Sequence, residues 1–190
     1  MFYKVLKAIC NVLFLLIFRR RVTGRENIPL EGGAIVAMNH RSNWDVPIAA
    51  LATKRKLRFM AKAEMFKSKP GAWFFGALGA FPVHRGKGDI GAIKAALVRL
   101  KEGHIIAMFP EGRRVRKGMH EDPKPGVVML AMKAKVPVVP VHITGEYRWF
   151  GKINVTFGKP IYYDDFYDKK VVMEQLQDLS NELMNTINSL

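Results

Sequence analysis

Residues 34–45 read Ala-Ile-Val-Ala-Met-Asn-His-Arg-Ser-Asn-Trp-Asp, an apolar run that passes directly into a polar cluster. The apolar part, residues 34–38, is short and bounded by glycines and an asparagine, so it is predicted to be a buried strand. The cluster contains serine, asparagine and aspartate, the residue types that most often begin helices. We therefore expect His40 in a turn just beyond the C-terminal end of a strand, with Asp45 at the start of the next helix.

The spacing between His40 and Asp45 restricts how the two side chains can meet. On a helix, neighbouring side chains are three or four residues apart, and on a strand an odd offset places them on opposite faces. They meet only if the chain turns between them, and the aspartate would then hold the imidazole Nδ1–H and leave Nε2 free as a general base. The alternative is a solvated loop histidine with a separate helix-capping aspartate. This alternative is favoured when a His-x-x-x-x-Asp pair is considered without the rest of the chain.

The composition limits the class of protein. The chain has 190 residues, of which 49% are hydrophobic, and this suits one folded domain with its own core. Its formal net charge of +15 implies an anionic partner, which can be nucleic acid, an anionic membrane surface or a phosphorylated substrate. The single cysteine, Cys10, cannot form an internal disulfide, which fits a reducing compartment. The histidines and the cysteine form no pair with metal-ligand spacing, so no metal site is expected.

Residues 1–21 form a distinct N-terminal segment. An unbroken apolar run from Val12 to Phe18 is followed by three arginines at positions 19–21. The run is shorter than the ~20 residues that a membrane span needs, so we interpret the segment as a helix lying in the membrane interface. Its lysines and arginines would then lie at the headgroups. An amphipathic helix packed on the protein's own core is the second interpretation, and a signal peptide fits less well because no cleavage site follows.

Beyond residue 21, the predicted strands and helices alternate. Further strands are expected at 57–61, 80–83, 104–109, 136–143 and 153–157, and helices at 71–79, 90–101, 127–134 and 171–190. We therefore expect residues 22–190 to form a single layered α/β domain, in which helices flank a largely buried mixed sheet. The helix at 71–79 contains Trp73, Phe74 and Phe75, which are expected either to face lipid or an acyl chain or to be ordinary core residues.

Three polar clusters each follow a predicted strand, at residues 39–45, 84–87 and 111–114. In open α/β sheets, ligands bind beyond the carboxyl ends of the strands, so the three clusters are expected to line one cleft. The first cluster offers a base. The other two offer cations that suit a phosphate group, namely Arg85, Lys87, Arg113 and Arg114. Glu111 is expected to orient one of these arginines or to accept a hydrogen bond from a substrate hydroxyl.

Four blocks of the sequence, in this order, resemble the glycerolipid acyltransferase family, of the bacterial 1-acyl-sn-glycerol-3-phosphate acyltransferase type. Residues 39–45 resemble its His-x-x-x-x-Asp motif, and residues 79–85, Gly-Ala-Phe-Pro-Val-His-Arg, resemble its second block. Residues 109–114, Phe-Pro-Glu-Gly-Arg-Arg, resemble its Phe-Pro-Glu-Gly-Thr-Arg block, and residues 136–141 resemble a fourth, apolar block with prolines. Arg113 stands where the family usually has threonine, so the preferred acceptor headgroup can differ.

The resemblance implies a function and a role for each residue. The protein is expected to transfer a fatty acyl group from an acyl thioester to the sn-2 hydroxyl of lysophosphatidate, giving phosphatidate for phospholipid biosynthesis. His40 would be the general base and Asp45 its orienting carboxylate. The acceptor phosphate is expected to be bound by Arg85 and Arg114, with Glu111 and Gly112 shaping the turn and Arg113 as a further substrate-binding residue. Backbone N–H groups of a nearby turn or Lys87 are the candidates for oxyanion stabilisation.

The resemblance also implies the partners. The acyl donor is expected to be acyl-CoA or acyl carrier protein, acting as substrate, with no cofactor. The expected location is the cytoplasmic face of the cell membrane, as a peripheral or monotopic protein on an anionic bilayer surface. Alternatives are an acyltransferase acting on glycerol-3-phosphate or another lysophospholipid, and a basic nucleic-acid-binding protein. The last is disfavoured because the chain has no zinc-finger spacing, RNP-like motif or helix dense in basic residues.

Overall fold

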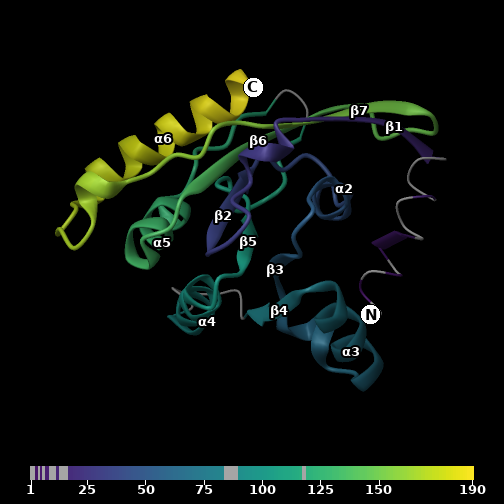
Figure 1. Ribbon diagram of the computed structural model, residues 1–190, viewed down its shortest axis with the longest axis horizontal. Helices are drawn as coiled ribbons and strands as arrows, with labels where there is room; N and C mark the ends of the chain where they lie inside the picture. Colours follow the sequence, from purple (N-terminus) through teal and green to yellow (C-terminus); the bar gives the residue numbers. More distant parts are fainter. Residues whose placement is uncertain are drawn as a thin grey trace.

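The computed structural model describes residues 3, 5, 7, 8, 12, 17–83, 90–116 and 119–190. These residues form a sheet whose seven strands lie in the order β1-β7-β6-β2-β5-β3-β4 (Figure 1). The strands are β1 (Phe18–Thr23), β2 (Ala34–Met38), β3 (Leu57–Lys62), β4 (Ala80–Val83), β5 (Ile105–Met108), β6 (Val138–Gly145) and β7 (Gly151–Phe157). The helices are α2 (Asp45–Ala52), α3 (Lys69–Leu78), α4 (Ile90–Lys101), α5 (Gly126–Ala134) and α6 (Met173–Ser189), with short 3₁₀ turns η1 (Arg25–Asn27), η2 (Ala63–Phe66) and η3 (Asp164–Phe166).

The sheet is mixed, as predicted. Neighbouring strands are parallel except for the antiparallel pair β6 and β7. Strand β7 is antiparallel because only a five-residue connection, residues 146–150, joins it to β6, whereas each parallel neighbour is reached through a longer crossover. The prediction of a layered α/β domain with a largely buried mixed sheet is confirmed.

Strand β2 lies at the centre of the core, and all five of its residues are buried. Because successive side chains of a strand point to opposite faces, β2 contributes to two apolar layers. Ile35 and Ala37 belong to the layer covered by α4, α5 and α6, whereas Ala34, Val36 and Met38 belong to the layer that includes Ile48 of α2. Figure 1 shows these helices on the two faces of the sheet. This burial on both faces explains why the sequence of β2 is a continuous apolar run.

The boundary of the N-terminal segment differs from the prediction. Residues 18–21, which we assigned to the interfacial segment 1–21, belong to β1, which pairs in parallel with β7 at the edge of the sheet. Phe18 is buried and Arg19 and Arg21 are exposed, so the arginines lie on an edge strand, where charged side chains discourage pairing with another chain. Of residues 1–17, the described ones are helical, and the remainder of the predicted interfacial helix lies outside the described residues. None of the helices described is both long enough and apolar enough to cross a membrane.

The sheet order determines which polar clusters become neighbours. Strand β2 lies between β5 and β6 and is parallel to both, so the residues that follow β2 and β5 meet at the same edge of the sheet. Strand β4 ends at this edge too, but β5 and β3 separate it from β2, which corresponds to about 14 Å at the usual strand spacing. The first and third polar clusters are therefore in direct contact, and the second follows a more distant strand.

Candidate active site

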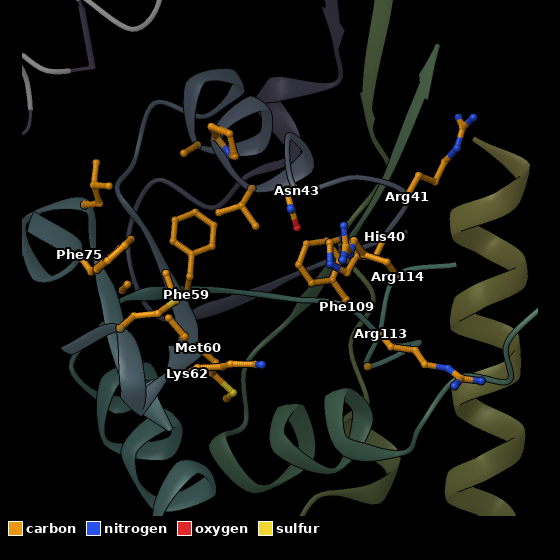
Figure 2. Close-up of a pocket in the computed structure, with 18 of the residues that line it drawn as sticks. His40, Arg41, Asn43, Phe59, Met60, Lys62, Phe75, Phe109, Arg113 and Arg114 are labelled. Carbon is orange, nitrogen blue, oxygen red and sulfur yellow. The ribbon is translucent and has the colours of Figure 1, made fainter. Parts of the chain in front are cut away.

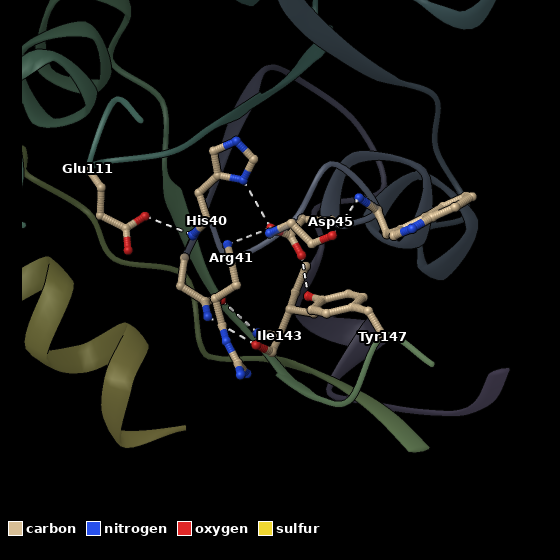
Figure 3. Close-up of polar contacts among 9 residues, drawn as sticks. His40, Arg41, Asp45, Glu111, Ile143 and Tyr147 are labelled. Carbon is tan, nitrogen blue, oxygen red and sulfur yellow. Dashed lines mark hydrogen bonds and ion pairs between the residues drawn. The ribbon is translucent and has the colours of Figure 1, made fainter. Parts of the chain in front are cut away.

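The side chains of His40 and Asp45 are in contact, because the chain turns between them (Figure 3). His40 Nδ1 lies 2.9 Å from Asp45 Oδ2. The same oxygen accepts hydrogen bonds from the backbone N–H groups of Arg41 and Ser42, both at 2.7 Å. Asp45 is the first residue of α2, and these partners of its Oδ2 all lie in the turn that precedes the helix. It therefore fixes the turn that brings it to the histidine, instead of capping the helix as the alternative interpretation proposed.

The second oxygen of Asp45 has a partner that the sequence did not reveal. The hydroxyl of Tyr147, in the connection between β6 and β7, donates a hydrogen bond to Asp45 Oδ1. Burial, together with this contact with the carboxylate, raises the pKa of Tyr147, so the hydroxyl retains its proton and remains a donor. Asp45 is fully buried, and donors on both oxygens hold its carboxylate in one orientation.

The imidazole ring of His40 is also held on its face. It stacks on the ring of Phe109, with a centroid distance of 3.8 Å and an interplanar angle of 17°. Phe109 directly follows β5, so the stacking joins the first cluster to the segment that leads into the third. Because Nδ1 faces a carboxylate that can only accept, we assign the proton to Nδ1, and Nε2 is then the free base.

Glu111 lies in a different place from the one we expected. It is 4% exposed, and its Oε2 accepts the backbone N–H of His40 at 2.7 Å. Val115 of the same loop donates its N–H to the carbonyl oxygen of His40 at 2.8 Å, so this loop holds the His40 backbone on both sides. Desolvation by burial raises the pKa of Glu111 to about 7, although the hydrogen bond from His40 acts in the opposite direction. In the part of the chain that the structure describes, Glu111 thus contacts the backbone of the histidine and forms no ion pair with an arginine, and its contact with a substrate hydroxyl stays a prediction.

The cations of the third cluster lie at the surface beside His40. Arg113 and Arg114 are exposed and line the cavity that His40 also lines, and Arg113 forms an ion pair with Glu121. Gly112 precedes them at φ 70°, where its N–H bonds to the carbonyl of Phe109. A side chain at 112 would be strained in this conformation, so the glycine lets the chain turn sharply after β5.

Further basic residues line the same cavity. Arg41 and Arg116, which the sequence analysis did not single out, are both exposed and both contribute to its wall. The signal that could have identified Arg41 is its position beside His40. Arg85 and Lys87, which were predicted to bind phosphate and the oxyanion, lie outside the described residues.

The cavity has a volume of about 1060 Å³ and two chemically different ends (Figure 2). His40 and the arginines lie at one end. At the other end the wall is mainly apolar and includes Phe59 and Met60 of β3 and Phe75 and Leu78 of α3, with Lys62 beside Met60. This combination suits a molecule with an anionic headgroup and an alkyl chain, with a base located between the two parts.

Comparisons of the sequence with known proteins all indicate acyltransferases. Residues 19–144 match the family model described as Acyltransferase. The 1-acyl-sn-glycerol-3-phosphate acyltransferase of Bacillus subtilis is 32% identical over 77% of this chain and 75% of its own length. The enzyme of the same name from Streptococcus pneumoniae is 33% identical over 82% of this chain and 60% of its own length.

A solved structure has the same fold. The crystal structure of the 1-acyl-sn-glycerophosphate acyltransferase PlsC from Thermotoga maritima superposes with a TM-score of 0.76 and 26% sequence identity. The match covers 98% of this chain and 78% of that chain. Sequence and structure therefore point to the same family.

Proposed function

Because this chain belongs to the acyltransferase family, we propose that it acylates the sn-2 hydroxyl of lysophosphatidate and so forms phosphatidate. It is an acyltransferase, and two of its relatives carry the name of this lysophosphatidate reaction. The observation that carries the proposal is the His40–Asp45 pair, in which a buried carboxylate with donors on both oxygens holds an imidazole beside a cavity that is cationic at one end and apolar at the other.

The proposed reaction uses this geometry. Nε2 of His40 takes the proton from the acceptor hydroxyl as its oxygen attacks the thioester carbonyl. The tetrahedral intermediate collapses, the carbon–sulfur bond breaks, and the leaving thiolate takes the proton back from the imidazolium. Asp45 stabilises the imidazolium while it carries that proton, as the carboxylate does in a catalytic triad whose nucleophile here is the substrate. Positioned base catalysis of this kind contributes roughly 10²- to 10⁴-fold to the rate.

The two ends of the cavity separate the two parts of the acceptor. Arg114 and Arg113 supply guanidinium groups for the phosphate, and Arg41 adds a third cation at the same end. Arg85 and Lys87 remain candidates for the phosphate and the oxyanion. Phe59 and Met60 of β3, with Phe75 and Leu78 of α3, would contact the acyl chain.

We extend the proposal to the donor and the location. The donor is an acyl thioester of CoA or of acyl carrier protein, and the protein acts on the cytoplasmic face of the membrane as a peripheral or monotopic protein. The net charge of +15 supports contact with an anionic bilayer surface. The N-terminal residues up to 17 are the proposed interfacial helix.

The test uses purified protein with lysophosphatidate and either acyl-CoA or acyl carrier protein in mixed micelles, with phosphatidate detected by mass spectrometry. The wild type should form product and His40→Ala should not. His104→Ala is the matched control, because His104 precedes β5 at the opposite edge of the sheet and should be replaceable without loss. Product from His40→Ala at the wild-type rate would refute the assigned base, and no product from folded wild type with either donor would refute lysophosphatidate as the acceptor.

A second acceptor remains a candidate because of position 113. Arg113 is exposed and is paired with Glu121, so the rim that would face the headgroup carries an ion pair where the family usually has threonine. A panel of glycerol-3-phosphate, lysophosphatidate and lysophospholipids with larger headgroups distinguishes the acceptors. A higher kcat/KM for one of the other acceptors would replace lysophosphatidate in the proposal.

A further inference from the structure

Helix α3 is exposed in an unusual way for a helix so rich in apolar residues. Its ten residues are Lys-Pro-Gly-Ala-Trp-Phe-Phe-Gly-Ala-Leu, and none of them is buried. Trp73 is 61% exposed and Phe74 is 42% exposed, and Met65 in the preceding turn η2 is 40% exposed. Exposed apolar side chains gathered on one element commonly mark a contact site.

Helix α3 is capped at both ends although none of its residues is buried. Ser68 accepts the backbone N–H of Gly71 at 3.1 Å, which caps the N-terminus. Gly79 ends the helix at φ 99°, with its N–H bonded to the carbonyl of Gly76. The structure therefore maintains α3 as a formed helix while leaving its tryptophan and phenylalanine at the surface.

The charges around these aromatics are predominantly positive. Lys67 and Lys69 are exposed, and Glu64 is the only acidic residue between positions 63 and 78. Tryptophan beside lysine is the combination found at the headgroup level of membranes, where the ring lies among the headgroups and the ammonium groups face anionic lipid. Each lysine near an anionic leaflet strengthens binding.

The exposed face is continuous with the wall of the cavity. Phe75 and Leu78 on the same helix, and Met65 on η2, line the apolar end of the cavity whose other end holds His40. Figure 2 shows Phe75 on the side of the cavity away from His40 and the arginines. A bilayer that contacts Trp73 and Phe74 therefore lies beside the apolar end of the cavity.

We propose that residues 63–78 form a membrane-docking surface, which inserts Trp73 and Phe74 into the headgroup layer of an anionic bilayer and brings the apolar end of the cavity to the lipid. This surface is separate from the N-terminal segment. The reason for docking rests on the proposed function, because the acceptor is a membrane lipid, but the contact with lipid is measured without any turnover.

Fluorescence quenching tests the contact directly. In the Trp44→Phe/Trp149→Phe variant, Trp73 is the single remaining tryptophan. On vesicles of phosphatidylglycerol and phosphatidylcholine with brominated acyl chains, its emission should shift to shorter wavelength and be quenched. The control variant carries Met173→Trp and has phenylalanine at all three native tryptophan positions. Its single tryptophan lies on α6, far from α3 in Figure 1, and its emission should not be shifted or quenched.

The outcomes separate the proposal from its alternatives. Vesicle-bound protein with an unquenched Trp73 overturns the proposal, as does equal quenching of the α6 reporter. A chain that does not bind anionic vesicles at all also overturns it, and would favour a protein partner for this face.

Substitution tests the consequence. Trp73→Ser/Phe74→Ser should bind anionic vesicles at least about tenfold more weakly, because it removes the two largest apolar groups of the surface. Its acylation of an acceptor presented in vesicles should fall similarly, whereas its rate on a short-chain acceptor dissolved as monomer should stay within about twofold of wild type. Val172→Ser/Met173→Ser is the matched control, since these side chains are 61% and 68% exposed at the start of α6.

These results also distinguish the two proposals. If the wild type acylates lysophosphatidate in micelles but the double variant binds vesicles as well as the wild type does, the docking surface is refuted and the function stands. If Trp73 is quenched but no acceptor is acylated, the docking surface stands and the proposed function is refuted.

Discussion

Replacing Asp45 with asparagine isolates the charge of the carboxylate from its shape. The asparagine oxygen can still accept the N–H groups of Arg41 and Ser42, and its amide group can donate to the hydroxyl oxygen of Tyr147. The turn should therefore survive the substitution. What is lost is the negative charge that stabilises His40 when it carries the substrate proton.

The size of this loss follows from the geometry. Nδ1 and Oδ2 are 2.9 Å apart, which places the centres of charge about 4 Å apart, and at an effective dielectric constant of about 20 the attraction is about 4 kcal/mol. Since ~1.4 kcal/mol corresponds to tenfold in rate, kcat should fall by roughly 10³-fold. KM for the acceptor should change little, because the interaction appears only when the imidazole is protonated.

The assay is steady-state acylation in mixed micelles at saturating donor, with circular dichroism to confirm the fold. Asp168→Asn is the matched control, because this carboxylate is exposed and pairs with Lys135 at the surface. The reasoning is refuted if folded Asp45→Asn keeps kcat within tenfold of wild type, or if the loss is in KM with kcat unchanged.

Three further substitutions test the surroundings of the histidine. Burial raises the pKa of Glu111 from 4.5 to about 7, so the folded chain binds this proton more tightly than the unfolded chain does. The free energy of unfolding should therefore fall as pH rises from about 4.5 to 7. Glu111→Gln should remove this pH dependence, worth at most about 3 kcal/mol, when urea unfolding is compared at pH 5 and pH 8. Tyr147→Phe removes a donor to a buried carboxylate, so it should cost about 1.5–3 kcal/mol of unfolding free energy and lower kcat without raising KM; an unchanged kcat would make the tyrosine purely structural. Asn39 directly follows β2, and its side chain bonds to both the N–H and the C=O of Ile143 in β6. Asn39→Ala should therefore cost about 2–4 kcal/mol in the same unfolding assay, and a cost below ~1 kcal/mol would contradict this role.

The central elements could be predicted because their sequences satisfy several constraints together. Strand β2 is a short apolar run between turn residues, and α4 was predicted at its observed bounds because an apolar stripe begins after an aspartate and ends before a glycine. The contact between His40 and Asp45 could be predicted conditionally, since the spacing allows it only across a turn. Because β2 and β5 are parallel neighbours, the first and third clusters, which follow them, lie at the same edge of the sheet.

The features that the sequence analysis missed or misplaced have a common physical cause: each is determined by a contact between residues far apart in the sequence. Strand β1 was assigned to the N-terminal segment because its arginines suit an edge strand as well as a membrane surface, and pairing with β7 decides between these. Tyr147 reaches Asp45 from 102 residues away, with no local pattern to mark it. Glu111 was recognised as a polar residue after a strand, but the sequence does not reveal that its side chain accepts the backbone N–H of His40.

The two interpretations of Asp45, as a local structural residue and as a catalytic residue, are not alternatives in this fold. One oxygen, Oδ2, accepts both N–H groups of the turn and the imidazole Nδ1–H, so the interactions that close the turn also orient the base. The turn that these N–H groups close brings His40 next to the carboxylate. Changing the number of residues between His40 and Asp45 would therefore disrupt the turn and the base together, whereas Asp45→Asn separates the two roles. This dependence explains why the fixed spacing of the motif, and not the two residue types alone, carries the prediction of function.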